Sequence, residues 1–233
     1  MTTLPFAELI SAETIHAGWI PKRQQLADAG TEEPLRIRVH RCYIALKRAE
    51  LVEQEGSGVD VDAALVLRWI ALNALYGSWD GQANMPVKDR VALDVFTSEV
   101  CRVDQGRRLH AALLKVMQDA KALLENSFVI ERFWRNPEWD QVRPQRGRAA
   151  NFRDDLIGGR TARALHALLI AVYFLRCQIV HGGATLGSSL NRTTVEPAAR
   201  ILSLLSSQVL ACVTEHGLEM QWGEICYPPV RPS

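Results

Sequence analysis

The sequence predicts an all-α fold, an antiparallel bundle of helices. Apolar residues recur at helical spacing through most of the chain, and no run shows the sustained alternation between turn signals that marks a strand. The 233 residues, 48% of them hydrophobic, are enough for one substantial core. We therefore expect a single domain over residues 1–233. Its helical core should cover about 34–216, followed by an extended tail over 217–233.

Four helices are predicted in the first half of the chain. The first covers residues 35–55, and the turn signal Glu55-Gly-Ser-Gly58 ends it. The second covers 61–76, with Asp60 as the N-cap and Gly77 at the stop. Residues 87–103 and 107–125 follow as two more helices, separated by Gly106.

Residues 134–159 are predicted to form a long loop with at most short helical turns, because prolines and glycines interrupt any regular pattern. Arginines alternate here with aromatic residues, a composition that suits single-stranded RNA. The candidate RNA-binding residues are Arg143, Arg146 and Arg148. Acidic residues are also interspersed, so a solvated loop with internal ion pairs fits the composition equally well.

A strongly apolar helix is predicted over residues 161–180, and Gly182-Gly183 ends it. A helix that is apolar nearly all round lies in a core or a subunit interface. His166, Arg176 and Gln178 make this stretch too polar for a membrane span. The N-terminus lacks the basic and apolar regions of a secretory signal. We expect a cytoplasmic protein without a membrane anchor, whose last helix covers 195–216.

Charge and cysteine content exclude several classes of protein. Lysine and arginine (27) nearly balance aspartate and glutamate (26), so a general nucleic-acid binder is not expected, and any nucleic acid would bind at a local patch. The five cysteines are odd in number and no pair has C-x-x-C spacing. This argues against a disulfide scaffold and a structural zinc site. We expect neither a metal nor a cofactor.

The helix over 161–180 carries the residues with the clearest chemical potential. Arg176 interrupts its apolar surface, so the guanidinium must pair with a carboxylate or face a cleft that an anion can enter. His181 follows five positions later, about 140° around an ideal helix. The two side chains share a face only if the last turn loosens, which Gly182 and Gly183 permit. A paired arginine and a helix-capping histidine would also be ordinary architecture.

An arginine and a histidine together suit one reaction, the cleavage of RNA through its own 2′-hydroxyl. A histidine near neutral pH can act as base or acid. An arginine can stabilise the charge that develops on the phosphate. This reaction requires no metal.

Three segments resemble the HEPN superfamily, and in particular a bacterial HEPN-like group. They are Leu175-Arg-Cys-Gln-Ile-Val-His-Gly-Gly-Ala-Thr185 with Asn191-Arg192, then Trp69-Ile-Ala-Leu-Asn-Ala-Leu-Tyr76, and Trp222-Gly-Glu-Ile-Cys-Tyr-Pro-Pro-Val230. The resemblance spans about residues 34–230. It implies a metal-independent endoribonuclease of a toxin–antitoxin or phage-defence system, in which two motifs of a homodimer face one cleft.

The resemblance also implies roles for individual residues. Arg176 would contact the scissile phosphate and His181 would transfer a proton. Cys177 departs from the family pattern, since a polar residue often follows the arginine, and cysteine is a weak hydrogen-bonding group. Cys177, Gln178 and Asn73 are candidate supporting residues. Asn73 would orient the motif helix or bond to backbone.

Other members of the family are inert modules, so a second function stays open. In that alternative the chain binds a protein partner or a nucleotide ligand and has no activity of its own. The ribonuclease hypothesis requires Arg176 and His181 to reach one cleft. A buried carboxylate pair at Arg176, or a closed cleft, would favour the inert module.

Overall fold

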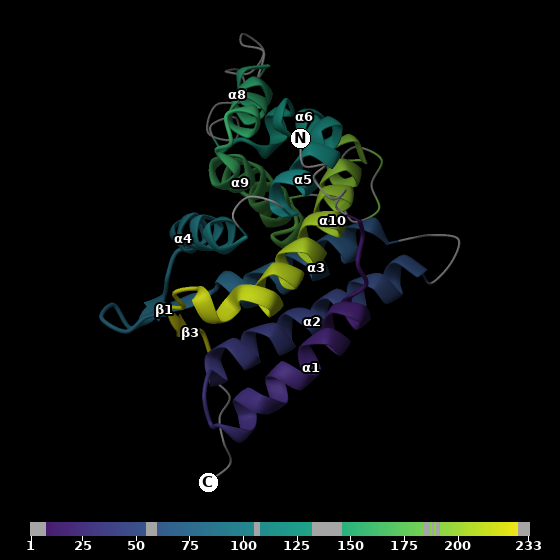
Figure 1. The fold of residues 1–233 in the computed structure, drawn as a ribbon. Coiled ribbons are helices and arrows are strands. Elements are labelled where there is room, and N and C mark those ends of the chain that lie inside the picture. Colours follow the sequence, from purple (N-terminus) through teal and green to yellow (C-terminus); the bar gives the residue numbers. More distant parts are fainter. Residues whose placement is uncertain are drawn as a thin grey trace, which may run out of the picture.

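The computed structural model describes residues 8–54, 60–104, 108–131, 146–183, 187, 189 and 192–227, and this part of the chain is predominantly helical (Figure 1). The predicted helical character is therefore confirmed. The α-helices are α1 (Ala12–Asp28), α2 (Glu33–Gln54), α3 (Val61–Tyr76), α4 (Asp89–Val103), α5 (Arg108–Lys115), α6 (Met117–Leu124), α8 (Arg146–Ile157), α9 (Thr161–Val180) and α10 (Arg192–His216). Two 3-10 turns, η1 (Ser127–Val129) and η4 (Gly217–Glu219), complete the helical elements.

A small sheet, which the sequence analysis did not predict, joins the end of α3 to the tail. Its strands are β1 (Ser78–Asp80), β2 (Met85–Pro86) and β3 (Glu224–Ile225), in the order β2-β1-β3 with both pairings antiparallel. Strands of two or three residues are too short to produce an alternating pattern. The expectation of helices alone is wrong in this respect. The tail contains η4 and β3, so its described part is not simply extended.

The predicted limits of α3 and α9 are confirmed by their local chemistry. The Asp60 carboxylate accepts a hydrogen bond from the Ala63 backbone N–H at 2.9 Å, as an N-cap should. The Gly77 N–H donates to the Asn73 carbonyl at 2.8 Å where α3 ends. A Cβ on Gly77 would also lie 2.8 Å from that carbonyl oxygen, so only glycine fits there without a shift.

Three further segments differ from the prediction. Residues 107–125 contain two helices rather than one, separated at Val116. The segment predicted as a loop over 134–159 contains the twelve-residue helix α8, while residues 134–145 lie outside the described part. Helix α1 lies before the predicted core and packs on α2.

Helix α10 is the most buried helix and packs against α3, α5 and α6. Helix α9, predicted to lie in a core or a subunit interface, packs mainly on α4 and α8. Both α9 and residues 192–219 are long and apolar enough to cross a membrane by length and composition, so polarity alone does not exclude a span by α9. Length and composition alone fit buried core helices equally well, and 72% of the most apolar window of the second is buried.

Arg38 of α2 fastens the sheet and the tail to the helices. Its side chain is buried, and its two terminal nitrogens donate to four backbone carbonyls, those of Leu75, Gly77, Gly223 and Glu224. Desolvation lowers the pKa of this guanidinium. The end of α3 and the segment before β3 thus share one anchor.

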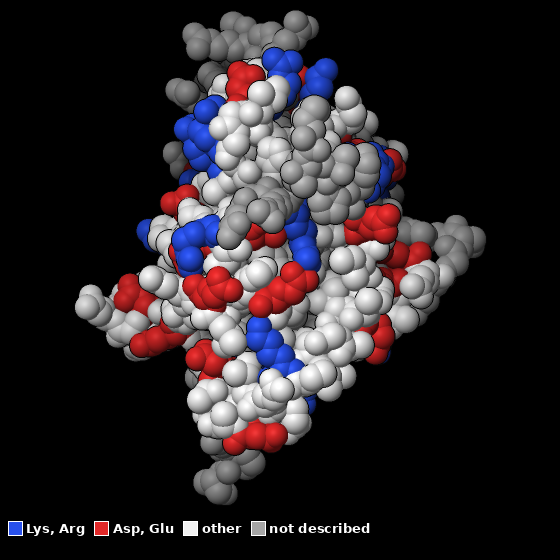
Figure 2. Space-filling view, viewed as in Figure 1, with Lys and Arg blue, Asp and Glu red and all other residues white. Residues whose placement is uncertain are grey.

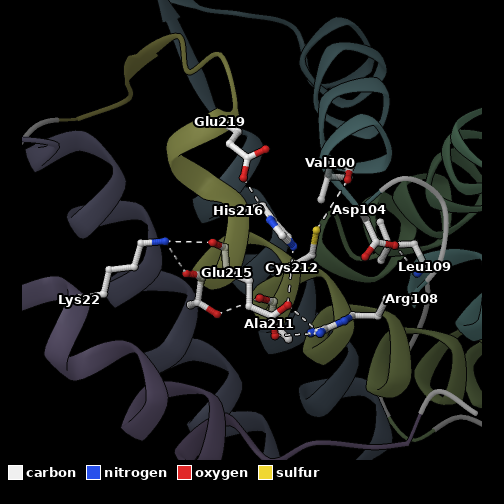
Figure 3. A network of polar contacts seen from close by, with 11 residues as sticks. Lys22, Val100, Asp104, Arg108, Leu109, Ala211, Cys212, Glu215, His216 and Glu219 are labelled. Carbon is white, nitrogen blue, oxygen red and sulfur yellow. Dashed lines mark hydrogen bonds and ion pairs between the residues drawn. The ribbon is translucent and has the colours of Figure 1, made fainter. Parts of the chain in front are cut away.

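A second polar network fixes the C-terminal end of α10 (Figure 3). The Arg108 guanidinium donates to both carboxylate oxygens of Glu215 at 2.8 Å. Lys22 of α1 donates to the carbonyls of Thr214 and Glu215, where a cation complements the helix C-terminus. These contacts join α1 and α5 to α10 and have a structural role.

Candidate functional site

A cavity of about 750 Å³ opens between α2, α3 and the small sheet. This volume is typical of a small-molecule site. Helices α2 and α3 contribute most to its wall, whereas each strand of the sheet contributes one residue. Helices α4 and α9 also contribute one residue each, Asp89 and Arg176. The motif arginine therefore faces an open cavity, as the ribonuclease hypothesis requires of that residue.

The cavity wall is apolar along α2 and α3 and carries more positive than negative charge. Its apolar residues include Ile44 and Ile70, which are 51% and 49% exposed. The cations are Arg41, Arg48 and Arg176, with His40 beside them, and Asp89 is the one carboxylate in the lining. A wall of this kind suits an anionic ligand that also has an apolar part.

The Arg176 guanidinium has no carboxylate partner among the residues that the structure describes. Its recorded contact is a weak one, from Nη1 to the Cys177 Sγ at 3.7 Å. Arg48 is exposed and likewise makes no ion pair within the described ranges. Arg41 instead donates to the carbonyls of Cys226 and Tyr227, at 3.0 and 2.6 Å, and so holds the tail against the cavity.

Asp89 is held by two donors from α3. The Asn73 Nδ2 lies 3.3 Å and the Tyr76 hydroxyl 3.1 Å from the same oxygen, Oδ1. Burial, reinforced by the Asp89 charge, raises the pKa of Tyr76, so this hydroxyl stays a donor. Asn73 thus orients the cavity carboxylate. This differs from the predicted bond to backbone, and within the described residues the Asn73 side chain makes no hydrogen bond to the motif helix.

Aromatic side chains pack behind Arg176. The Trp69 ring lies 6.0 Å from those of Tyr76 and Tyr173, measured between centroids. Trp69 and Tyr76 are buried and belong to the core, so they do not form a stacking surface. Burial raises the pKa of Tyr173, and the neighbouring Cys177 raises it further. This apolar backing fixes the helix face from which Arg176 projects.

His181 lies outside the cavity lining, on the surface at the end of α9. It is exposed, and its backbone N–H still donates to the Cys177 carbonyl at 3.0 Å, so the helix has not loosened before it. The chain turns only at Gly182, whose φ of 72° favours glycine. The loosening that would bring Arg176 and His181 to one face is therefore not present in the described residues. One copy of the chain does not unite them in one cavity.

The surface beside His181 is partly apolar. Gln178 donates to the Phe128 carbonyl and so joins α9 to η1. Phe128 is 42% and Val180 is 50% exposed. This hydrogen bond of Gln178 is a structural contact at the end of the motif helix.

Of the three predicted RNA-binding arginines, Arg148 has a described side chain, and this side chain does not line the cavity. Arg148 is half-buried on α8, and its Nη1 donates to the Leu124 carbonyl at 3.3 Å. Burial lowers its pKa. Arg143 lies outside the described residues, and only the backbone of Arg146, at the start of α8, is described. In Figure 1, helix α8 lies at the top of the molecule, whereas the sheet lies well below it at the left, beneath α4.

The cavity lining also contains charged or imidazole side chains that were not predicted as site residues, among them His40, Arg41, Arg48 and Asp89. A local signal existed for some of them. His40, Ile44 and Arg48 follow one another at intervals of four, which puts them on one face of α2. Nothing in the sequence indicated that this face lies opposite Arg176.

On the face seen in Figure 2, acidic and basic side chains are interspersed rather than gathered by sign, in keeping with the formal net charge of +1. No cluster of three or more metal-binding side chains occurs among the described residues. Comparisons of the chain with family models, curated proteins and solved structures gave no match.

Proposed function

We propose that this protein is a metal-independent endoribonuclease of HEPN type, in which Arg176 contacts the scissile phosphate and His181 transfers a proton. The observation that carries the proposal is the placement of Arg176. An arginine in an otherwise apolar helix lines an open cavity and has no carboxylate partner in the described part of the chain. The resemblance of residues 175–192 to the HEPN motif supplies the expected chemistry. An RNA substrate fits a cytoplasmic setting, such as a toxin–antitoxin or phage-defence system.

The separation of His181 from the cavity makes a homodimer part of this proposal. In one chain, Arg176 lines the cavity whereas His181 lies on the outer surface. We propose that a second copy of the chain brings its own arginine and histidine to a cleft shared by both copies. The exposed apolar side chains of Phe128 and Val180 at this end of α9 support such a contact. Light scattering of the purified chain at micromolar concentration should give twice the monomer mass. A monomer that still cleaves RNA would remove the dimer from the proposal.

A second candidate function is an inert HEPN module that binds a protein partner or a nucleotide ligand. The position of His181 favours it, because the cavity can bind an anion through Arg176 without any proton transfer. The departure at Cys177 also favours it.

Cleavage assays on single-stranded RNA, with EDTA present, test the proposal. Loss of the base should lower the rate by about 10²–10⁴-fold in His181→Ala. Loss of the charge stabiliser should lower it by about 10²–10³-fold in Arg176→Ala. Arg163→Ala is the matched control, since Arg163 is an exposed arginine on the same helix whose nearest acidic oxygen is 3.6 Å away. Products ending in a 2′,3′-cyclic phosphate are expected. A double variant carries both Arg176→Ala and His181→Ala. If the wild-type protein cleaves diverse RNAs no faster than this double variant, the nuclease proposal is wrong and the inert module is the better assignment.

A further inference from the structure

We infer that the cavity between α2 and α3 binds one nucleotide unit, with its phosphate at the arginines and its base against Ile44 and Ile70. The inference deepens the proposed function by naming the ligand unit. Only the identification of this nucleotide as part of an RNA rests on the ribonuclease proposal. Nucleotide binding stands on the cavity itself.

The charge of the lining points to a phosphate. Three guanidinium groups and the His40 imidazole face a space with one carboxylate, that of Asp89. Neither Arg48 nor Arg176 is neutralised by a carboxylate in the ranges that the structure describes. Arginine recognises phosphate oxygens through paired N–H donors. A phosphate in the cavity would offset the positive charge.

The apolar part of the lining points to a flat, weakly polar group attached to that phosphate. Ile44 and Ile70 are half exposed, although both belong to helices that bury their other faces in the core. Leu67, Pro86 and Val87 continue the same wall. A nucleobase would cover this surface, whereas inorganic phosphate would leave it in water.

Asp89, the acidic residue of the cavity lining, offers a hydrogen-bond acceptor in a fixed position. Both recorded donors to Asp89 bind Oδ1, and no protein donor to Oδ2 occurs among the described residues. The bonds from Asn73 and Tyr76 hold the carboxylate in one orientation. Asp89 can accept a hydrogen bond from a ribose hydroxyl or an exocyclic amine, groups that a nucleotide carries and a simple alkyl phosphate lacks.

Calorimetric titration of the full chain at low salt tests the inference. The probes are the four ribonucleoside 3′-monophosphates, with adenosine and inorganic phosphate as comparators. At least one nucleotide should bind, and both comparators should bind at least about tenfold more weakly. Arg48→Gln should weaken nucleotide binding about 10- to 100-fold, the usual effect of a charge-assisted hydrogen bond. Ile70→Ser should weaken it as well. Arg23→Gln removes an exposed arginine of α1 outside the cavity and should have no effect.

The outcomes separate this inference from the proposed function. If no nucleotide binds at millimolar concentration, or Arg48→Gln and Ile70→Ser bind like the wild type, the cavity assignment is wrong even where RNA is cleaved. Nucleotide binding that both variants weaken, in a protein that leaves RNA intact, supports the cavity assignment and removes the nuclease. Circular dichroism spectra and melting temperatures of both exposed-site variants should match those of the wild type.

Discussion

The Asp62 carboxylate binds the Arg192 guanidinium through both of its oxygens, with Nη2 lying 2.8 Å from Oδ1 and 2.7 Å from Oδ2. The same carboxylate accepts the Gly187 backbone N–H at 2.9 Å. Asp62 is in the first turn of α3, whereas Gly187 and Arg192 follow the motif histidine. This contact therefore fastens the segment after His181 to the helix that forms one wall of the cavity.

Arg192→Gln should lower the free energy of unfolding by about 3–5 kcal/mol, because it leaves the buried Asp62 carboxylate without its cation. Urea denaturation measures the change. Arg200→Gln on the same helix is the control. Its exposed guanidinium pairs with Asp119 at 2.7 Å, and such surface pairs contribute about 0–1 kcal/mol. Equal losses in the two variants would contradict the role assigned to Arg192.

Arg38→Lys should destabilise the protein by about 3 kcal/mol or more. A lysine has three donors on one nitrogen and cannot reach four carbonyls that belong to two segments. Each buried carbonyl left without a donor costs about 1–3 kcal/mol. Arg48→Lys, an exposed site on the same helix, should change stability by under about 0.5 kcal/mol. Thermal denaturation of the two variants measures the difference. If Arg38→Lys melts at the same temperature as Arg48→Lys, the four hydrogen bonds of Arg38 do not hold the tail to the end of α3.

Two glycine substitutions should act in opposite directions. Gly182→Ala puts a Cβ on a residue with a φ of 72° and should cost about 1–2 kcal/mol. Gly18→Ala in the middle of α1, where a Cβ meets nothing within 4 Å, should stabilise by about 0.5–1 kcal/mol. Melting temperatures should therefore fall in the first variant and rise in the second. A rise in both would mean that the turn after His181 does not need glycine.

Asp104 should make the stability depend on pH. Burial raises the pKa of its carboxyl above the ordinary value of 3.8, although hydrogen bonds from backbone N–H groups such as that of Leu109 oppose the shift. The folded state thus favours the neutral acid. The stability linked to this group is present below pH 3.8 and is lost as the pH rises through the raised pKa.

Asp104→Asn removes this titration and keeps an acceptor for the Leu109 N–H. The free energy of unfolding of the wild type, relative to the variant, should therefore fall as the pH rises from acid to neutral. Urea midpoints measured across that range give the slope. A slope of the opposite sign would show that the backbone donors outweigh the burial of the charge.

Elements set by local chemistry could be predicted from the sequence. Helix α3 begins after the Asp60 cap and ends at Gly77, and α9 covers Thr161–Val180, as the apolar pattern and the following glycines indicated. Helix α8 was missed because Gly147 and the nearby prolines suggested a loop, whereas its buried Phe152 and Leu156 pack against the core. In that segment, tertiary packing outweighed local propensity.

The candidate site could be predicted only in part, because most of its contacts join distant segments. The sequence identified Arg176 as a residue that needs an anion or a cleft, and the structure gives it a cavity. It could not identify Asp89, because the Asn73–Asp89 bond depends on how α4 follows the sheet. The position of His181 relative to Arg176 could not be predicted either. It depends on whether the last turn of α9 keeps its hydrogen bond from the His181 N–H to the Cys177 carbonyl.

The anchor at Arg38 has a consequence for the order of events during translation. The carbonyls of Gly223 and Glu224 that it binds lie 185 and 186 residues further along the chain, and Arg41 reaches Cys226 and Tyr227 in the same way. A nascent chain that has not yet reached these residues lacks one wall of the cavity. The cavity between α2, α3 and the sheet therefore stays incomplete until residues 223–227 have been synthesised and have reached Arg38 and Arg41.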